Sequence, residues 1–166
     1  MNKIVKFCLS VGLLFPLGFQ SADAKTIVAT GKGSKGQILT VTPGASIKDN
    51  QVLTVTGRNY QMNVGIYVAF CEIPTKGKKP EHCSGGINMD GTSKGSVWIS
   101  SNPPWYIPSA LLTPFGKGGT FKVQVTAVRF IDKTDCKVKK CGVITRADHT
   151  RGDYRLADVL VPLTFK

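Results

Sequence analysis

The sequence has few of the residues that catalytic and metal sites require. It contains only two histidines, His82 and His149, and they lie in different segments of the chain. Neither histidine has a pair of carboxylates beside it, and no Ser-His-Asp or Cys-His arrangement can be drawn. A metal site needs several ligands that converge, which two distant histidines do not supply. The sequence therefore predicts a non-enzymatic protein with no metal and no cofactor.

Long amphipathic stretches with helical periodicity are also missing, and so are internal repeats. Glycine and proline are abundant instead, with 18 and 9 residues, which is typical of a turn-rich β domain. Short segments with alternating apolar and polar residues recur between the turns. The seven predicted strands are 38–43, 53–58, 64–71, 96–100, 120–131, 141–147 and 157–165. This pattern predicts an all-β, seven-stranded, immunoglobulin-like antiparallel β-sandwich.

One predicted strand, 64–71, is apolar on both faces. Val68 and Phe70 belong to one row, and Tyr67 and Ala69 lie on the opposite row. A strand that is covered on both sides needs something packed against its outer face. We expect a loop or a ligand at that place.

Long apolar runs are absent except near the N-terminus. Residues 7–19 are apolar, follow Lys3 and Lys6, and precede the small-residue motif ADA at 22–24. This run is short for a membrane span and is typical of a secretory signal peptide. We therefore expect residues 1–24 to be removed, no transmembrane segment to remain, and the protein to be extracellular or associated with the cell envelope.

The cysteine count fits an exported protein. Removal of the leader with Cys8 leaves Cys71, Cys83, Cys136 and Cys141. An even number of cysteines in an exported chain predicts two disulfides, for which three pairings are possible. Closeness in sequence favours two local pairs, Cys71 with Cys83 and Cys136 with Cys141. Residues 25–36 are expected to be a flexible lead-in with room for a brief edge strand, and 37–166 to be one domain.

Acidic residues are scarce. The chain has 22 basic and 10 acidic residues and a formal net charge of +12. Such a charge favours anionic surroundings, for example nucleic acid, anionic lipid or an acidic wall polymer. A well-solvated surface without a specific partner is the alternative. The lysines that would bind a polyanion lie in the two cysteine loops and are Lys76, Lys78, Lys79, Lys137, Lys139 and Lys140.

Two long stretches resemble the neocarzinostatin family. They are LTVTPGASIKDNQVLTVTGRNYQMNVGIYVAFC (39–71) and DCKVKKCGVITRADHTRGDYRLADVLVPLTF (135–165), and the likeness in order and spacing covers 37–166. The resemblance implies a β-sandwich with a small disulfide-pinned ribbon subdomain and a cleft between them. In that family the cleft holds an enediyne chromophore that acts on DNA, and the apoprotein protects and releases it without catalysis.

The sequence departs from the family around the implied cleft. The familiar carriers are acidic and line the cleft with aromatic side chains, whereas this chain is basic and has Ile73 two places after the first cysteine. Ile144 and Arg146 stand where the family has small polar residues. The identity of a ligand therefore does not follow from the resemblance.

A long loop, 101–119, offers other aromatic side chains for the cleft. Apolar residues in a long loop need something to pack on, and either the sandwich core or a ligand could provide it. The expected ligand contacts come from this loop, from the predicted strands 64–71, 96–100 and 141–147, and from the first cysteine loop. These are Tyr67, Ile73, Trp98, Trp105, Tyr106, Phe115, Ile144 and Arg146.

Two functions from different classes follow from these features. The first is a secreted, monomeric carrier that holds a small apolar or aromatic ligand in a cleft beside the sheet. The second is a basic envelope protein that binds DNA or an anionic wall polymer through its lysines, with an antibacterial role in line with the family's biology.

Overall fold

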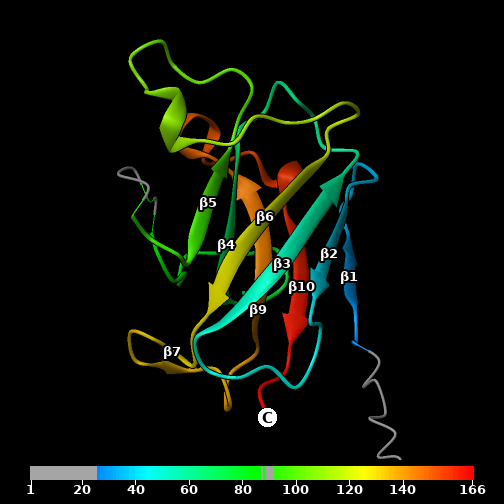
Figure 1. Cartoon of the computed structure of the whole chain (residues 1–166), viewed down its shortest axis with the longest axis vertical. Coiled ribbons are helices and arrows are strands. Elements are labelled where there is room, and N and C mark those ends of the chain that lie inside the picture. Colours follow the sequence, from blue (N-terminus) through cyan, green and yellow to red (C-terminus); the bar gives the residue numbers. More distant parts are fainter. Residues whose placement is uncertain (1–25, 87, 89–91) are drawn as a thin grey trace, which may run out of the picture.

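Two four-stranded antiparallel sheets and a two-stranded ribbon make up the fold (Figure 1). The computed structural model describes residues 26–86, 88 and 92–166, and the predicted signal peptide, 1–24, lies outside these described residues. The first sheet has the order β1-β2-β3-β6, the second has the order β10-β9-β4-β5, and β7 pairs with β8. The strands are β1 (Ala29–Lys32), β2 (Ile38–Thr42), β3 (Gln51–Arg58), β4 (Ile66–Glu72), β5 (Ser96–Ile99), β6 (Phe121–Ala127), β7 (Phe130–Ile131), β8 (Thr134–Asp135), β9 (Cys141–Ala147) and β10 (Val159–Leu163).

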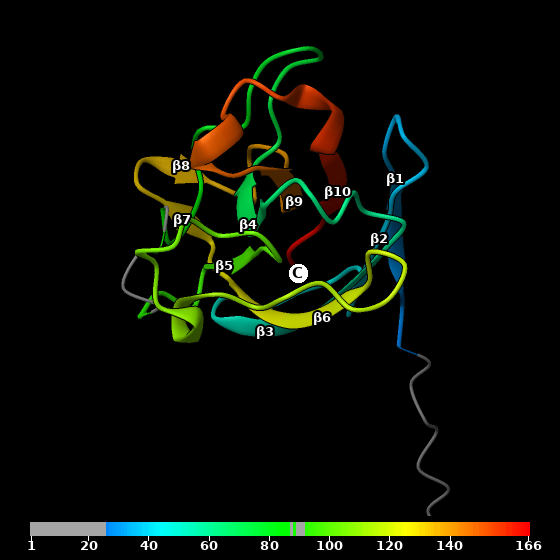
Figure 2. The ribbon, with the colours of Figure 1, turned by 90° about the horizontal axis from the view of Figure 1, so that it is seen from above.

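The core lies between the two sheets, which form separate layers when seen from above (Figure 2). In β3 the alternation of apolar and polar residues places Leu53 and Val55 inward, both fully buried. In β4 the inward row includes Val68 and Phe70, also fully buried, and the ring of Phe70 meets that of Phe165 edge-on at 6.1 Å. The predicted all-β antiparallel sandwich is confirmed.

Each of the seven predicted strands corresponds to a strand of the structure, but the predicted total of seven strands is too low. Within the described residues the two sheets contain eight strands, and the ribbon adds two more. The predicted strand 120–131 is divided into β6 and β7, because the backbone N–H of Arg129 donates to Asp49 Oδ1 at 2.8 Å and the chain leaves the sheet there. Asp132 then takes a left-handed φ of 50° at the turn into β8.

The predicted lead-in, 25–36, contains the eighth sheet strand. β1 pairs with β2 along its whole length and lies at the edge of the first sheet, so it is the brief edge strand for which the sequence left room. Gly31 in β1 passes close to β10, where an added Cβ would lie 2.5 Å from the carbonyl oxygen of Leu160. β10 lies at the edge of the second sheet, where Pro162, which cannot donate a ladder hydrogen bond, is tolerated.

The disulfides are the two local pairs that the sequence favoured, Cys71–Cys83 and Cys136–Cys141. The second closes the loop between the ribbon and β9, and the ribbon is further held by Arg129, whose guanidinium donates to both oxygens of Asp135 at 3.0 and 2.7 Å. The guanidinium holds the pKa of the Asp135 carboxyl at about 2, below its ordinary value. The predicted disulfide-pinned ribbon subdomain is therefore present.

Candidate functional site

The outer face of β4 is covered by a loop of the same chain. After β4 the chain turns back, so that the segment His82–Ser84 runs antiparallel to the end of the strand. The backbone N–H of Glu72 donates to the carbonyl of His82 at 2.9 Å, and that of Ser84 donates to the carbonyl of Phe70 at 2.8 Å. The Cys71–Cys83 disulfide fixes this return. The two-faced strand thus carries a tethered loop, residues 73–86, which is one of the two coverings that its sequence predicted.

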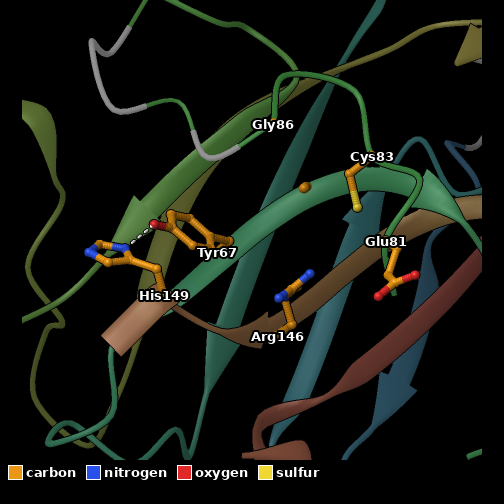
Figure 3. Close-up of a pocket in the computed structure, with 7 residues that line it drawn as sticks. Tyr67, Glu81, Cys83, Gly86, Arg146 and His149 are labelled. Carbon is orange, nitrogen blue, oxygen red and sulfur yellow. Dashed lines mark hydrogen bonds between the residues drawn. The ribbon is translucent and has the colours of Figure 1, made fainter. Parts of the chain in front are cut away.

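A cavity of about 190 Å³ remains between this loop and the outer face of the second sheet (Figure 3). Its polar lining comes from three places: β4, β9 with the residues that follow it, and the tethered loop. Ala69 and the sulfur of Cys83 add apolar surface. The lining residues are Tyr67, Ala69, Glu81, Cys83, Gly86, Arg146 and His149.

One wall of the cavity is a packed group of rings. The hydroxyl of Tyr67 forms a hydrogen bond with His149 Nδ1 at 2.6 Å. Behind this pair the indole of Trp98 lies 6.0 Å from the Tyr67 ring and 5.1 Å from the His149 ring, between centroids. The Trp98 indole N–H donates to Asp148 Oδ2 at 2.9 Å, and the Thr150 N–H donates to Asp148 Oδ1 at 3.0 Å. The buried Asp148 therefore fixes both the indole and the turn that carries His149.

Arg146 supplies the positive charge of the cavity. It is the register partner of Tyr67 across β4 and β9, so both side chains leave the same face of the sheet. Its Nη1 donates to the carbonyl of Pro80 in the tethered loop at 2.6 Å. Its Nε is buried and has no hydrogen-bond partner within the described residues. A buried donor without a partner is costly, so this guanidinium is suited to an acceptor group of a ligand.

Burial raises the pKa of Tyr67 to about 12, and the charge of Asp148 acts in the same direction, whereas His149 and Arg146 oppose it. A raised pKa in the folded state stabilises the protein below the ordinary tyrosine pKa of about 10, and this stabilisation is lost as the pH rises through 12. Between pH 9 and 11.5 the unfolding free energy of the wild type should therefore fall by about 2 kcal/mol more than that of Tyr67→Phe, which lacks the ionisable hydroxyl. Urea unfolding at both pH values measures it.

The matched control for this experiment is Tyr106→Phe, which changes an exposed ring outside the cavity. Tyr60 is also buried and has a raised pKa, but its contribution is common to the wild type and to both variants. An identical pH dependence in Tyr67→Phe and the wild type would contradict the environment described for Tyr67.

Several predicted ligand contacts lie in or beside the cavity. Tyr67 and Arg146 line it, and Trp98 is packed directly behind Tyr67. Ile144 is fully buried in a small apolar cluster with Ala69 on the same sheet face, and Ile73 packs against that cluster. Ile73 and Ile144 therefore support the floor beside the cavity without lining it.

The aromatic residues of the loop 101–119 do not reach the cavity. Phe115 is buried in the main core, where its ring lies 6.4 Å from that of Tyr60. Trp105 and Tyr106 have exposed fractions of 95% and 62%, and their rings contact each other at 5.8 Å. The loop extends from the end of the molecule opposite the ribbon (Figure 1). Contrary to expectation, the structure therefore does not bring Trp105, Tyr106 or Phe115 to this cavity.

The sequence interpretation missed Glu81 and His149 as parts of the cavity. His149 was set aside because it is remote from His82, but its partner is Tyr67, 82 residues away. A usable signal was the outward row of β9, which includes Arg146 and leads directly to Asp148. The pairing register of β4 with β9, which brings these residues to Tyr67, could not be read from the sequence.

The lysines predicted to bind a polyanion lie on two adjacent loops at one end of the second sheet. The backbone N–H of Ile73, in the first loop, donates to the carbonyl of Lys140, in the second, at 2.7 Å. Lys79 is half-buried, and the other members of the set are exposed. The exposed members are Lys76, Lys78, Lys137, Lys139 and Lys140.

Neither a metal cluster nor a membrane span is found in the part of the chain that the structure describes. No three His, Cys, Asp or Glu side chains there come together as metal ligands would. No helix there has the length and apolar character to cross a membrane.

Fold and site together define a disulfide-pinned β-sandwich with a small cleft on the outer face of one sheet. Neither a protein-family model nor a curated protein matches the sequence. Among solved structures the chain is similar to macromomycin, a member of the neocarzinostatin family, with 15% identity and a TM-score of 0.52. The likeness covers 79% of this chain and all of that one. At this identity it establishes the neocarzinostatin-like fold.

Proposed function

We propose that this chain is an exported, non-enzymatic binding protein that holds a small, partly apolar ligand in the cleft above β4 and β9. The observation that carries the proposal is the unpartnered, buried Nε of Arg146 beside a cavity whose other walls are two rings, a disulfide, Ala69, Gly86 and Glu81. Export is supported by the two disulfides, which persist in oxidising compartments, and by the character of residues 1–24.

The dimensions of the cleft limit the ligand. Pockets for drug-sized molecules measure roughly 300–1,000 Å³, and this cavity has about 190 Å³. The apolar part of the ligand, one or two rings in size, would pack against Tyr67, Ala69 and the sulfur of Cys83. An acceptor group, most effectively a carboxylate, would accept from Arg146, because hydrogen bonds to charged donors are the stronger ones.

A compact aromatic acid, 1-naphthoate, tests the proposal, with the neutral 1-naphthylmethanol as its uncharged counterpart. Calorimetry gives the Kd of each compound. The NMR resonance of the Trp98 indole N–H reports whether the compound binds in the cleft. This spectrum is recorded on a Trp105→Phe variant, in which Trp98 is the one remaining tryptophan. The protein is recovered from the growth medium, where the exported chain should begin at Lys25. We expect saturable naphthoate binding and a shift of the Trp98 resonance.

Arg146→Ala should weaken naphthoate binding about 10- to 100-fold, the range for a charge-assisted hydrogen bond, and change naphthylmethanol binding much less. Arg151→Ala is the matched control, because Arg151 is exposed and does not line the cavity. Equal losses in the two arginine variants, or a Trp98 resonance that stays unchanged at saturation, would overturn the proposal.

A further inference from the structure

The tethered loop borders a second depression on its other side, toward β10. This groove has a volume of about 560 Å³ and lies between the loop segment 74–78, the turn after β1 and the start of β10. Leu160 and Pro74 contribute apolar surface, and half of the remaining lining residues are basic. The groove and the cleft around Arg146 share no lining residue.

The groove brings together positive charges from distant parts of the sequence. Lys32 comes from β1, and Lys76 and Lys78 come from the tethered loop; all three are exposed. Arg155 also lines the groove but is already paired with Asp158, its one carboxylate. The ion pairs of the described residues are this one and Arg129–Asp135, so none of the three lysines is neutralised by a carboxylate there.

The tip of the loop has a defined conformation that presents two of these lysines. The backbone N–H of Lys78 donates to the carbonyl of Thr75 at 3.0 Å, which closes a β-turn. Gly77 occupies its third position with φ of +80°, as a type II turn requires. No atom lies within 4 Å of where a Cβ of Gly77 would be, so the tip is open on that side.

The positive surface continues past the groove onto the second cysteine loop. Pro74 lines the groove, and its neighbour Ile73 is hydrogen-bonded to the carbonyl of Lys140. Lys140 belongs to an exposed segment that also holds Lys137 and Lys139. A flexible chain of negative charges could therefore follow one strip, from the groove to the loop that precedes β9.

We propose that the groove formed by Lys32, Lys76 and Lys78 binds a base-free phosphodiester polymer of the glycerol-phosphate type. Lysine ammonium groups act as point charges toward phosphate. Recognition of single-stranded nucleic acid normally adds aromatic side chains on which bases stack, and no aromatic residue lines this groove. The lining of the groove thus fits a polymer that offers phosphates without bases.

The test measures binding of the full mature chain to immobilised poly(glycerol phosphate) at salt concentrations from about 50 to 200 mM. The triple variant Lys32→Gln/Lys76→Gln/Lys78→Gln should bind at least about tenfold more weakly and show a shallower dependence on salt, since each lost phosphate contact reduces that slope by roughly 0.7 to 0.9. The matched control is Lys48→Gln/Lys117→Gln/Lys122→Gln, which removes the same charge from exposed positions outside the groove.

Equal weakening in the two triple variants would show that net charge alone is responsible and would overturn the assignment. Tighter binding of single-stranded DNA than of poly(glycerol phosphate), at equal phosphate concentration, would also overturn the proposal, because it would identify nucleic acid as the ligand of the groove. Arg146→Ala should weaken polymer binding much less than the triple lysine variant does, because Arg146 does not line the groove. Failure of this proposal and failure of the small-ligand proposal are therefore separable.

Discussion

Replacing Phe70 by alanine is expected to lower the free energy of unfolding by about 3–5 kcal/mol, the range for loss of a large buried ring. Phe70 is fully buried in the middle of β4 and packs edge-on against Phe165. β4 has a sheet neighbour on either side and the tethered loop on its outer face. The surroundings can therefore collapse little into the space that the ring leaves.

Urea unfolding followed by circular dichroism measures this loss. Val52→Ala on β3 is the control, because Val52 has an exposed fraction of 51% and its truncation should cost less than about 1 kcal/mol. A loss of that small size for Phe70→Ala would contradict the packing described for β4.

The second large effect is expected from removal of the Cys71–Cys83 disulfide by the double change Cys71→Ala/Cys83→Ala. The cross-link spans a sequence separation of 12, for which the chain-entropy relation gives about 3 kcal/mol. The same change frees the loop that provides Glu81 and the sulfur surface of the cavity. Naphthoate binding should therefore disappear along with part of the stability.

Cys136→Ala/Cys141→Ala provides the comparison within the same molecule. Its cross-link spans a separation of 5, which gives about 2 kcal/mol, and neither cysteine lines the cavity. We expect this variant to retain naphthoate binding, measured by the same calorimetry under conditions where both variants are folded. Retention of binding in the Cys71/Cys83 variant would show that the disulfide is not needed for the cleft.

The layers of the fold were predictable because alternation reports burial directly. Leu53 and Val55 alternate with threonines in β3, which is what a strand with one solvated face requires. The double-sided apolar character of β4 also indicated a cover over Tyr67 and Ala69. The local disulfide pairs followed from sequence distance, and the cover proved to be the loop that one of them closes.

The site was harder to predict because it depends on register and on loop conformation. Nothing periodic in the loop 101–119 distinguishes Phe115, which enters the core, from Trp105, which is almost fully exposed. Likewise, His149 meets Tyr67 through the pairing of β4 with β9, and Lys32 joins Lys76 in the groove through the position of β1. These are long-range placements that no local pattern encodes.

The tethered loop has one more consequence, since it forms a wall of both depressions. It contributes Glu81 and Cys83 to the cleft, and Lys76 and Lys78 to the groove. Thermodynamic linkage then applies to any movement of this segment. A ligand in the cleft that shifts the loop changes the affinity of the groove by some factor, and the polymer must change the affinity of the cleft by the same factor. Small-molecule release and surface attachment would thus be reciprocally coupled through a single disulfide-bounded segment.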